Sequence, residues 1–162
     1  MIISKTPYRI SFFGGGSDYP EWYTENGGKV LSTTIDKYIY LSFRELPPYF
    51  GFKYRIVWSK VENTDHIKNI KHIVVRKLLP YMKVKKGIEL HYQADLPAKS
   101  GMGSSSSFIV GLANSILTYQ KKKISKENLA NKSIFFENEV LNEVVGIQDQ
   151  ISASVGGFNK ID

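Results

Sequence analysis

A glycine- and serine-rich segment between an expected strand and an expected helix constrains this chain most. Residues 88–94 alternate apolar and polar side chains, which predicts a half-buried strand. Residues 105–119 are apolar enough and long enough to predict a helix. The segment 95–107 joins them and contains Gly101 and Gly103, which permit backbone conformations closed to other residues and a close approach to a ligand.

The start of the expected helix suits an anion. Unpaired N–H groups and the positive end of the helix dipole favour negative charge there, and a serine hydroxyl in the first turn can coordinate Mg²⁺. The segment is neither a Walker A loop, since no Gly-Lys-Ser/Thr follows, nor a dinucleotide fingerprint, since the third glycine is missing. A flexible turn with a serine N-cap is the alternative interpretation.

The rest of the pattern predicts an α+β fold. Residues rich in β-branched and aromatic side chains predict strands at 2–13, 29–44 and 52–59. Helical spacing or turn signals predict helices at 21–25, 65–82, 126–142 and 148–155. Pro80 is expected to break the last turn of its helix, and Ser125 to cap the next one. Strands first and helices later favour a mainly antiparallel sheet with helices packed on one side.

Composition narrows the function classes only slightly. Lys and Arg number 22 against 15 Asp and Glu, and the net charge of +7 attracts nucleotides, phosphorylated metabolites and nucleic acids alike. Without cysteine, neither disulfides nor thiolate metal sites are available. The N-terminus lacks a signal-peptide pattern and no apolar run is long enough for a membrane span, so a cytoplasmic protein without membrane partners is expected.

Three separated segments resemble the GHMP superfamily of small-molecule kinases. Residues 97–105 resemble its second motif, Pro-x-x-x-Gly-Leu-Gly-Ser-Ser, with Met102 at the usual leucine. Residues 9–19 resemble the galactokinase signature Arg-Val-Asn-Leu-Ile-Gly-Glu-His-Thr-Asp-Tyr without gaps. Glu137-Asn138 and residues 146–150 resemble Glu-Asn…Gly-Ile-Met-Asp-Gln. The resemblance implies an ATP-binding N-terminal domain with the fold of these kinases, which a ribosomal protein domain shares.

The resemblance also implies roles for the matched positions. Asp149 is expected to take the proton of the acceptor hydroxyl, while Arg9 holds Asp149 ionised and stabilises the transferred phosphoryl group. Ser105 and Glu137 are implied as the Mg²⁺-associated pair. The ATP phosphates are expected at Pro97, Gly101, Met102, Gly103, Ser104, Ser105, Ser106 and Ser107. The sugar is expected at Gly14, Gly15, Gly16, Ser17, Asp18 and Tyr19.

Plainer interpretations exist for the charged positions. Asp149 is also an ordinary helix-start residue, Arg9 a strand-edge cation, and Asp18 a turn former after glycines. Glu137 lies near other glutamates and is compatible with a solvated acidic face. Adenine is expected against apolar side chains near the glycine loop, but the sequence assigns none of them.

Departures from the galactokinase pattern concern the choice of sugar. Gly15 and Gly16 stand where galactokinases have Glu and His, which opens space in the sugar pocket. With Gly-x-Gln-Asp-Gln and Gly-Gly-Phe-Asn, this variant resembles the D-glycero-D-manno-heptose kinases, which phosphorylate heptose 7-phosphate at the anomeric hydroxyl during surface-polysaccharide precursor synthesis. A fucose- or galactose-type 1-kinase stays open, and so does a non-catalytic domain that binds phosphate or, less expectedly, nucleic acid.

The resemblance implies that residues 1–162 form the first GHMP domain only. The second domain, which closes the cleft in these kinases, is expected to be absent from this chain. Weak turnover by the chain alone, and self-association through an exposed apolar face, are therefore further expectations.

Overall fold

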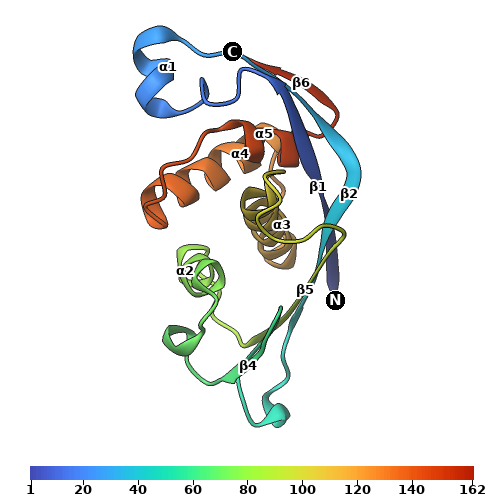
Figure 1. The fold of residues 1–162 in the computed structure, drawn as a ribbon. Helices are drawn as coiled ribbons and strands as arrows, with labels where there is room; N and C mark the ends of the chain where they lie inside the picture. The colour runs from blue at the N-terminus through green and yellow to red at the C-terminus, as the bar shows by residue number, and fades with distance from the viewer.

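The computed structural model describes residues 1–162, in which one six-stranded sheet carries helices on a single face (Figure 1). Five strands lie side by side in the order β1 (Ile2–Phe13), β2 (Val30–Glu45), β5 (Ile88–Ala94), β3 (Tyr54–Val57) and β4 (Val61–Thr64). β6 (Phe158–Ile161) pairs with the first residues of β2. Every pairing is antiparallel except that of β3 with β5, which confirms the α+β prediction.

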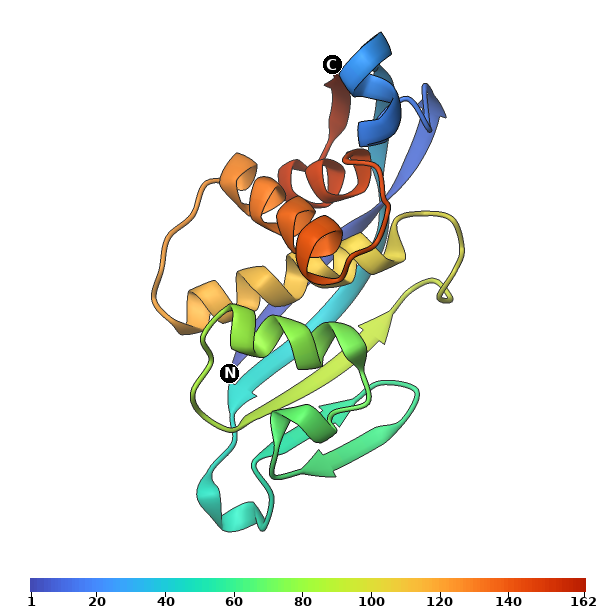
Figure 2. The same ribbon diagram turned by 90° about the vertical axis from the view of Figure 1, so that its left-hand side faces the viewer.

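The helices are α1 (Pro20–Asn26), α2 (Ile73–Tyr81), α3 (Ser104–Tyr119), α4 (Lys126–Phe135) and α5 (Gln148–Val155). Two 3₁₀ turns, Pro48–Phe50 and Ile67–Asn69, and a π-helical turn, Phe136–Val140, complete the elements. α3 lies directly against β1 and β2, with α2 and α4 on either side of it toward the viewer in Figure 2. None of these helices combines the length and the apolar character that a membrane crossing requires.

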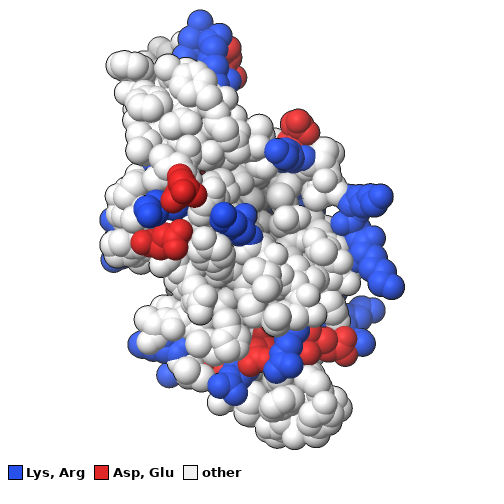
Figure 3. All heavy atoms as spheres, turned by 90° about the vertical axis from the view of Figure 1, so that its right-hand side faces the viewer, with Lys and Arg blue, Asp and Glu red and all other residues white.

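The core fills the space between the sheet and α3. β2 contributes Ile39, Leu41 and Phe43 on alternate positions, and α3 contributes Ile109 and Leu112; all five are fully buried. Because α3 is apolar on most of its circumference, it is enclosed by the sheet on one side and by helices on the other. The opposite face of the sheet stays open, with charged side chains gathered toward the end where β3 and β4 lie (Figure 3).

The helix predicted at 65–82 is wrong in its first half. The segment forms a short 3₁₀ turn and α2 begins only at Ile73. The carboxylate of Glu62 accepts hydrogen bonds from the backbone N–H groups of Lys71 and His72, so a side chain from β4 fixes where the helix starts. Pro80 lies in the last turn and α2 ends one residue later.

The helix predicted at 126–142 ends early. α4 stops at Phe135 and the chain continues as the π-helical turn, after which Asn142 adopts a left-handed φ of 60°. The N-cap prediction is confirmed, since Ser125 Oγ accepts the Asn128 N–H at 3.2 Å. The two four-residue strands β4 and β6 were not predicted.

Candidate active site

Two glycine-rich loops lie near each other in the fold: the first spans residues 14–19, and the second spans residues 97–103. Arg9 and Asp149 meet beside the second glycine loop although 140 residues separate them. Arg9 follows a bulge in β1, and Asp149 lies in the first turn of α5. Arg9 Nε donates to Asp149 Oδ1 at 2.6 Å, and Arg9 Nη1 donates to the carbonyl oxygen of Gly101 at 2.9 Å. The structure therefore brings together the two residues that the resemblance gives catalytic roles.

Burial and the charge of Arg9 act in opposite directions on the pKa of Asp149. Loss of solvent raises the pKa of this carboxyl above its usual range, and the nearby charge of Asp18 raises it further. Arg9 lowers the pKa, as the sequence led us to expect, but burial outweighs it. Arg9 thus favours the ionised carboxylate as expected, and burial acts in the opposite direction and increases the affinity of Asp149 for a proton.

The second glycine loop presses against this pair. Gly103 has φ of +77°, and a Cβ there would lie 3.1 Å from Asp149 Oδ2, so the position requires glycine. The first helical N–H to find a partner is that of Ser107, which donates to the Gly103 carbonyl at 2.9 Å. The N–H groups of Ser104, Ser105 and Ser106 have no acceptor in the protein, which leaves a helix start ready for an anion.

The four serines of this helix start face different surroundings. Ser104 and the exposed Ser105 line a cavity, whereas Ser107 is buried and donates to the carbonyl of Pro7 at 2.9 Å. Ser106, rather than Ser105, contacts Glu137, because successive helical residues point about 100° apart. Ser105 and Glu137, the pair implied for Mg²⁺, line the same cavity.

Glu137 is a buried acid, with an exposed fraction of 1%. Ser106 Oγ lies 3.0 Å from both of its oxygens, and Gln150 Nε2 donates to Oε2 at 2.7 Å. Burial raises the pKa of Glu137 to about 7, with a further rise from Glu143 and Asp149, against the hydrogen bonds from Gln150 and Ser106. No cation of the protein forms an ion pair with the Glu137 carboxylate. Its oxygens, together with the serine hydroxyls, are ligands that suit Mg²⁺.

The first glycine loop is closed by its own side chains. Asp18 is 3% exposed, and its carboxylate accepts N–H groups from Gly16 at 3.1 Å and from the backbone and side chain of Gln148 at 3.0 and 3.2 Å. Ser17 Oγ donates to the Gly14 carbonyl at 2.8 Å. Asp18 therefore fastens the loop to α5, and its oxygens are largely occupied.

Several cavities border these loops. The central cavity, about 330 Å³, is lined by Arg9, Asp18, Tyr19, Lys99, Gly101, Gly103, Ser104, Ser105, Ser106, Glu137, Glu143, Val145, Gly146, Gln148 and Asp149. The glycine cavity, about 490 Å³, is lined by Arg9, Ile10, Ser11, Gly15, Gly16, Tyr19, Gly101, Met102 and Gln148. Pro97 is exposed at the start of the second loop and lines neither cavity.

The aromatic cavity, about 360 Å³, was not predicted. It is lined by Trp58, His72, Val74, Tyr92, Ala98, Lys99, Ser104, Ser105 and Phe108. The rings of His72 and Phe108 stack with centroids 4.9 Å apart, and Trp58 meets His72 edge-on at 5.0 Å. Glu62 accepts the Trp58 ring N–H at 2.8 Å and the His72 backbone N–H, which fixes two of these rings. Burial lowers the pKa of His72 and so favours a neutral ring.

Several residues of the candidate site carried too little signal in the sequence. The aromatic cavity takes side chains from four separate segments, and a strand-end tryptophan such as Trp58 is more often part of a core. Lys99 stood in the motif at a position that the family leaves variable. Gln148 and Gln150 lay inside the recognised Gly-Ile-Gln-Asp-Gln segment, yet only Asp149 received a role.

Comparisons with known proteins agree with this architecture. The family model described as "GHMP kinases N terminal domain" matches residues 66–157. A D-glycero-alpha-D-manno-heptose 7-phosphate kinase from Campylobacter jejuni is 28% identical over 98% of this chain and 49% of its own length. A galactokinase from Chloroflexus aurantiacus is 24% identical over 95% of this chain and 40% of its own length. The chain thus spans half or less of the length of these curated relatives.

Solved structures support the same fold. A D-glycero-D-manno-heptose 1-phosphate kinase from Bacteroides thetaiotaomicron superimposes with a TM-score of 0.86 at 23% identity, over 99% of this chain and 55% of that one. A galactokinase from Lactococcus lactis, solved with galactose, gives a TM-score of 0.75 at 18% identity, over 98% of this chain and 47% of that one. At these identities the likeness concerns the fold alone.

Proposed function

The chain belongs to the GHMP kinase family, and on that premise we propose that it forms the ATP-binding part of a sugar kinase that phosphorylates an anomeric hydroxyl. The observation that carries the proposal is the contact of Arg9 with Asp149 directly beside the unpaired N–H groups of Ser104 to Ser106. A proton acceptor, a fixed cation and an anion site within one cavity are the parts that phosphoryl transfer to an alcohol requires.

Each part of the nucleotide has a matching surface. The phosphates bind at the N-terminus of α3, where Ser104, Ser105 and Ser106 line the central cavity and their N–H groups have no acceptor in the protein. Glu137 and the hydroxyls of Ser105 and Ser106 would hold Mg²⁺, which neutralises charge on the phosphate oxygens when it is bound. The adenine occupies the aromatic cavity, which shares Ser104 and Ser105 with the central one.

The transfer step follows from the Arg9–Asp149 pair. The sugar oxygen attacks the γ-phosphorus, the bond from that phosphorus to the bridging oxygen of ADP breaks, and the hydroxyl proton passes to Asp149. The raised pKa of Asp149 makes the carboxylate a better proton acceptor than an exposed aspartate. Arg9 is held by Asp149 and Gly101, and its remaining nitrogen, Nη2, has no partner in the protein and is free to stabilise the transferred group.

The glycine cavity is where the sugar binds. Gly15 and Gly16 present no side chain there, and a Cβ on Gly16 would meet nothing within 4 Å, so the cavity accommodates a large acceptor. We propose D-glycero-D-manno-heptose 7-phosphate as the substrate and its 1,7-bisphosphate as the product, supported by the Campylobacter jejuni relative. A fucose- or galactose-type sugar is the alternative, since galactokinases also match.

A panel of sugars tests the proposal. The polypeptide, in its full natural length, is assayed with ATP and Mg²⁺ on heptose 7-phosphate, fucose, mannose and galactose. We expect the heptose to be preferred, and Asp149→Asn to lower kcat by about 10²- to 10⁴-fold. Asp36→Asn, at an exposed position of β2, is the matched control. Full activity of Asp149→Asn, or no phosphorylation of any sugar, would contradict the proposal.

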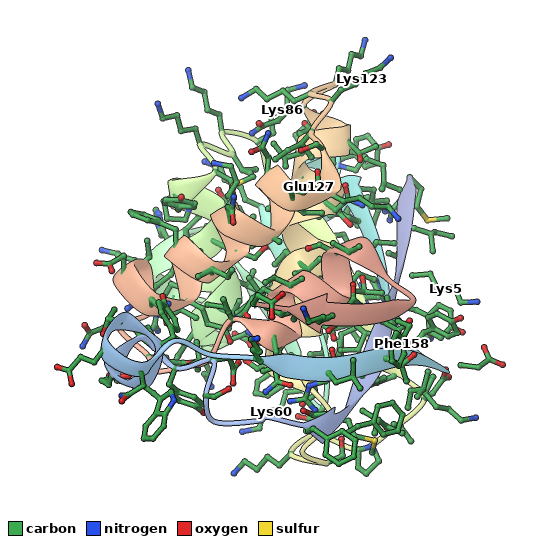
Figure 4. All side chains as sticks on the ribbon, turned by 90° about the horizontal axis from the view of Figure 1, so that it is seen from above. Lys5, Lys60, Lys86, Lys123, Glu127 and Phe158 are labelled. Atoms are coloured by element: carbon green, nitrogen blue, oxygen red, sulfur yellow. The ribbon has the colours of Figure 1, made fainter.

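A non-catalytic nucleic-acid-binding domain is the competing candidate, and the positive net charge favours it. Of the labelled lysines, Lys86 and Lys123 share the upper end of the view, whereas Lys5 and Lys60 extend from other sides of the molecule (Figure 4). Buried carboxylates such as Glu137 also repel a polyanion unless a cation accompanies it. A salt titration separates the candidates, because binding to a phosphate backbone weakens steeply as salt rises.

A further inference from the structure

Lys99 lies on the boundary between two cavities. It lines both the central cavity, which contains Asp149, and the aromatic cavity, which contains Trp58 and Phe108. Ser104 and Ser105 are the only other residues that line both. A ligand that fills the two cavities together must therefore pass beside these three residues.

The backbone of Lys99 is in a left-handed conformation that no helix end explains. Four residues other than glycine have positive φ: Lys83 at 56°, Lys99 at 62°, Lys121 at 58° and Asn142 at 60°. Lys83 follows α2, Lys121 follows α3 and Asn142 follows the π-helical turn, where a left-handed residue is a common way to end a helix. Lys99 stands in the loop before α3, and strained loop residues of this kind concentrate at ligand sites.

The charges of the central cavity are unbalanced without Lys99. Four carboxylates line the cavity, those of Asp18, Glu137, Glu143 and Asp149, against two cations. Arg9 is already paired with Asp149, whereas Lys99 makes no ion pair in the protein. Lys99 is thus the one cation of this cavity that is free to neutralise an incoming anion.

We propose that Lys99 binds the phosphates of the nucleotide that lie between the base and the transferred γ-group. The inference rests on the proposed function, since the base must occupy the aromatic cavity and the γ-phosphate must face Asp149. The ammonium group of Lys99 then supplies donors to phosphate oxygens at the junction, together with the N–H groups of Ser104 and Ser105. It contributes to affinity for the polyphosphate and not to the chemical step.

Binding of MgADP and of adenosine by calorimetry tests the inference, because only MgADP carries phosphates. Lys99→Gln is expected to weaken MgADP about tenfold and to leave adenosine unchanged, as for loss of one charge-assisted contact. Lys99→Arg keeps the charge and is expected to retain most of the affinity. Lys99→Gly loses the same affinity as Lys99→Gln, while its thermal stability rises because glycine accepts positive φ.

Lys121→Gln is the matched control, because Lys121 has nearly the same backbone conformation but lines none of the three cavities. It is expected to bind MgADP like the wild type. Unchanged MgADP affinity in Lys99→Gln, or an equal loss for adenosine, would overturn the inference and leave the kinase proposal standing. A wild-type protein that binds neither ligand would overturn both.

Discussion

The two glycine loops of the site are built in opposite ways. In the loop before α1, side chains bind part of the backbone: Asp18 accepts N–H groups from Gly16 and Gln148, and Ser17 donates to the carbonyl of Gly14. In the loop before α3, Arg9 takes up carbonyl oxygens only, those of Gly101 and Met102, and the following N–H groups stay free.

This difference indicates that the first loop shapes a cavity and that the second loop leads into an anion-binding helix start. A loop tied down by its own side chains keeps a fixed shape at the edge of a cavity, whereas a helix start with three free N–H groups gains stability from a bound anion. Gly14 in the first loop is closely packed against the Lys29 carbonyl, whereas Gly101 in the second loop has open space at its Cβ position. The following substitutions test that contrast, in order of decreasing effect on the free energy of unfolding.

Gly14→Ala has the largest expected effect. A Cβ at this position would lie 1.8 Å from the carbonyl oxygen of Lys29, and φ is +80°. The clash and the left-handed strain together are expected to lower the free energy of unfolding by about 3 kcal/mol. Thermal denaturation followed by circular dichroism measures this, as a fall in Tm of roughly 10 °C. A fall below about 2 °C would mean that the loop is not tightly closed.

Glu137→Gln is expected to stabilise the protein above neutral pH. The pKa of Glu137 rises from 4.5 in the unfolded chain to about 7 in the fold. The fold therefore favours the protonated acid, whose contribution is complete below pH 4.5 and lost as pH rises to about 7. At pH 8 the variant gains up to about 3 kcal/mol, a difference that vanishes near pH 4.5.

Urea unfolding of both proteins at pH 5 and pH 8 measures this difference. Gln keeps the packing, because its amide oxygen can accept from Gln150 while its amide nitrogen donates to the Ser106 hydroxyl. Equal stability of wild type and variant at both pH values would show that the carboxylate is already compensated.

Asp18→Asn is expected to cost about 2 kcal/mol. Both carboxylate oxygens of Asp18 accept N–H groups, so either orientation of an amide would place its N–H against another donor. The matched variant Asp36→Asn changes an exposed aspartate and is expected to cost less than about 0.5 kcal/mol. Equal Tm values for the two variants would contradict the inference that the hydrogen bonds of Asp18 hold the first loop to α5.

Gly101→Ala has the smallest expected effect. Its φ is +75°, but a Cβ would meet nothing within 4 Å. The only expected cost is therefore the left-handed strain of alanine, about 1 kcal/mol of unfolding free energy. Its Tm should fall by roughly 3 °C, well short of Gly14→Ala. A loss as large as that of Gly14→Ala would mean that both loops are closed to the same degree.

Local patterns predicted much of the fold. The strand bounds 2–13 and 88–94, and the helix 148–155, were obtained without error because alternation, turn glycines and apolar spacing agree there. The start of α2 was missed because it depends on Glu62, a side chain from a neighbouring strand. β6 was missed because its four residues are defined by pairing with β2, far away in the sequence.

The candidate site was predicted in its motifs and not in its contacts. The sequence placed Arg9 with Asp149, but it could not show that burial raises the pKa of the aspartate. The motif implied Ser105 and Glu137 as a pair at Mg²⁺, but it gave no sign that Ser106 contacts Glu137 directly. Trp58 lies outside the motifs, and Lys99 occupies a variable position within one of them. Only the folded chain shows that both line the same cavity.

Backbone amide shifts in a titration with Mg²⁺ and a non-hydrolysable ATP analogue test the central contrast most directly. We expect the largest changes at Ser104, Ser105 and Ser106, whose N–H groups are free, and small changes at Gly16 and Ser17. Adenosine alone should leave the three serine amides nearly unmoved. The largest changes in the first loop, or none in either, would contradict the claim that the start of α3 binds the polyphosphate.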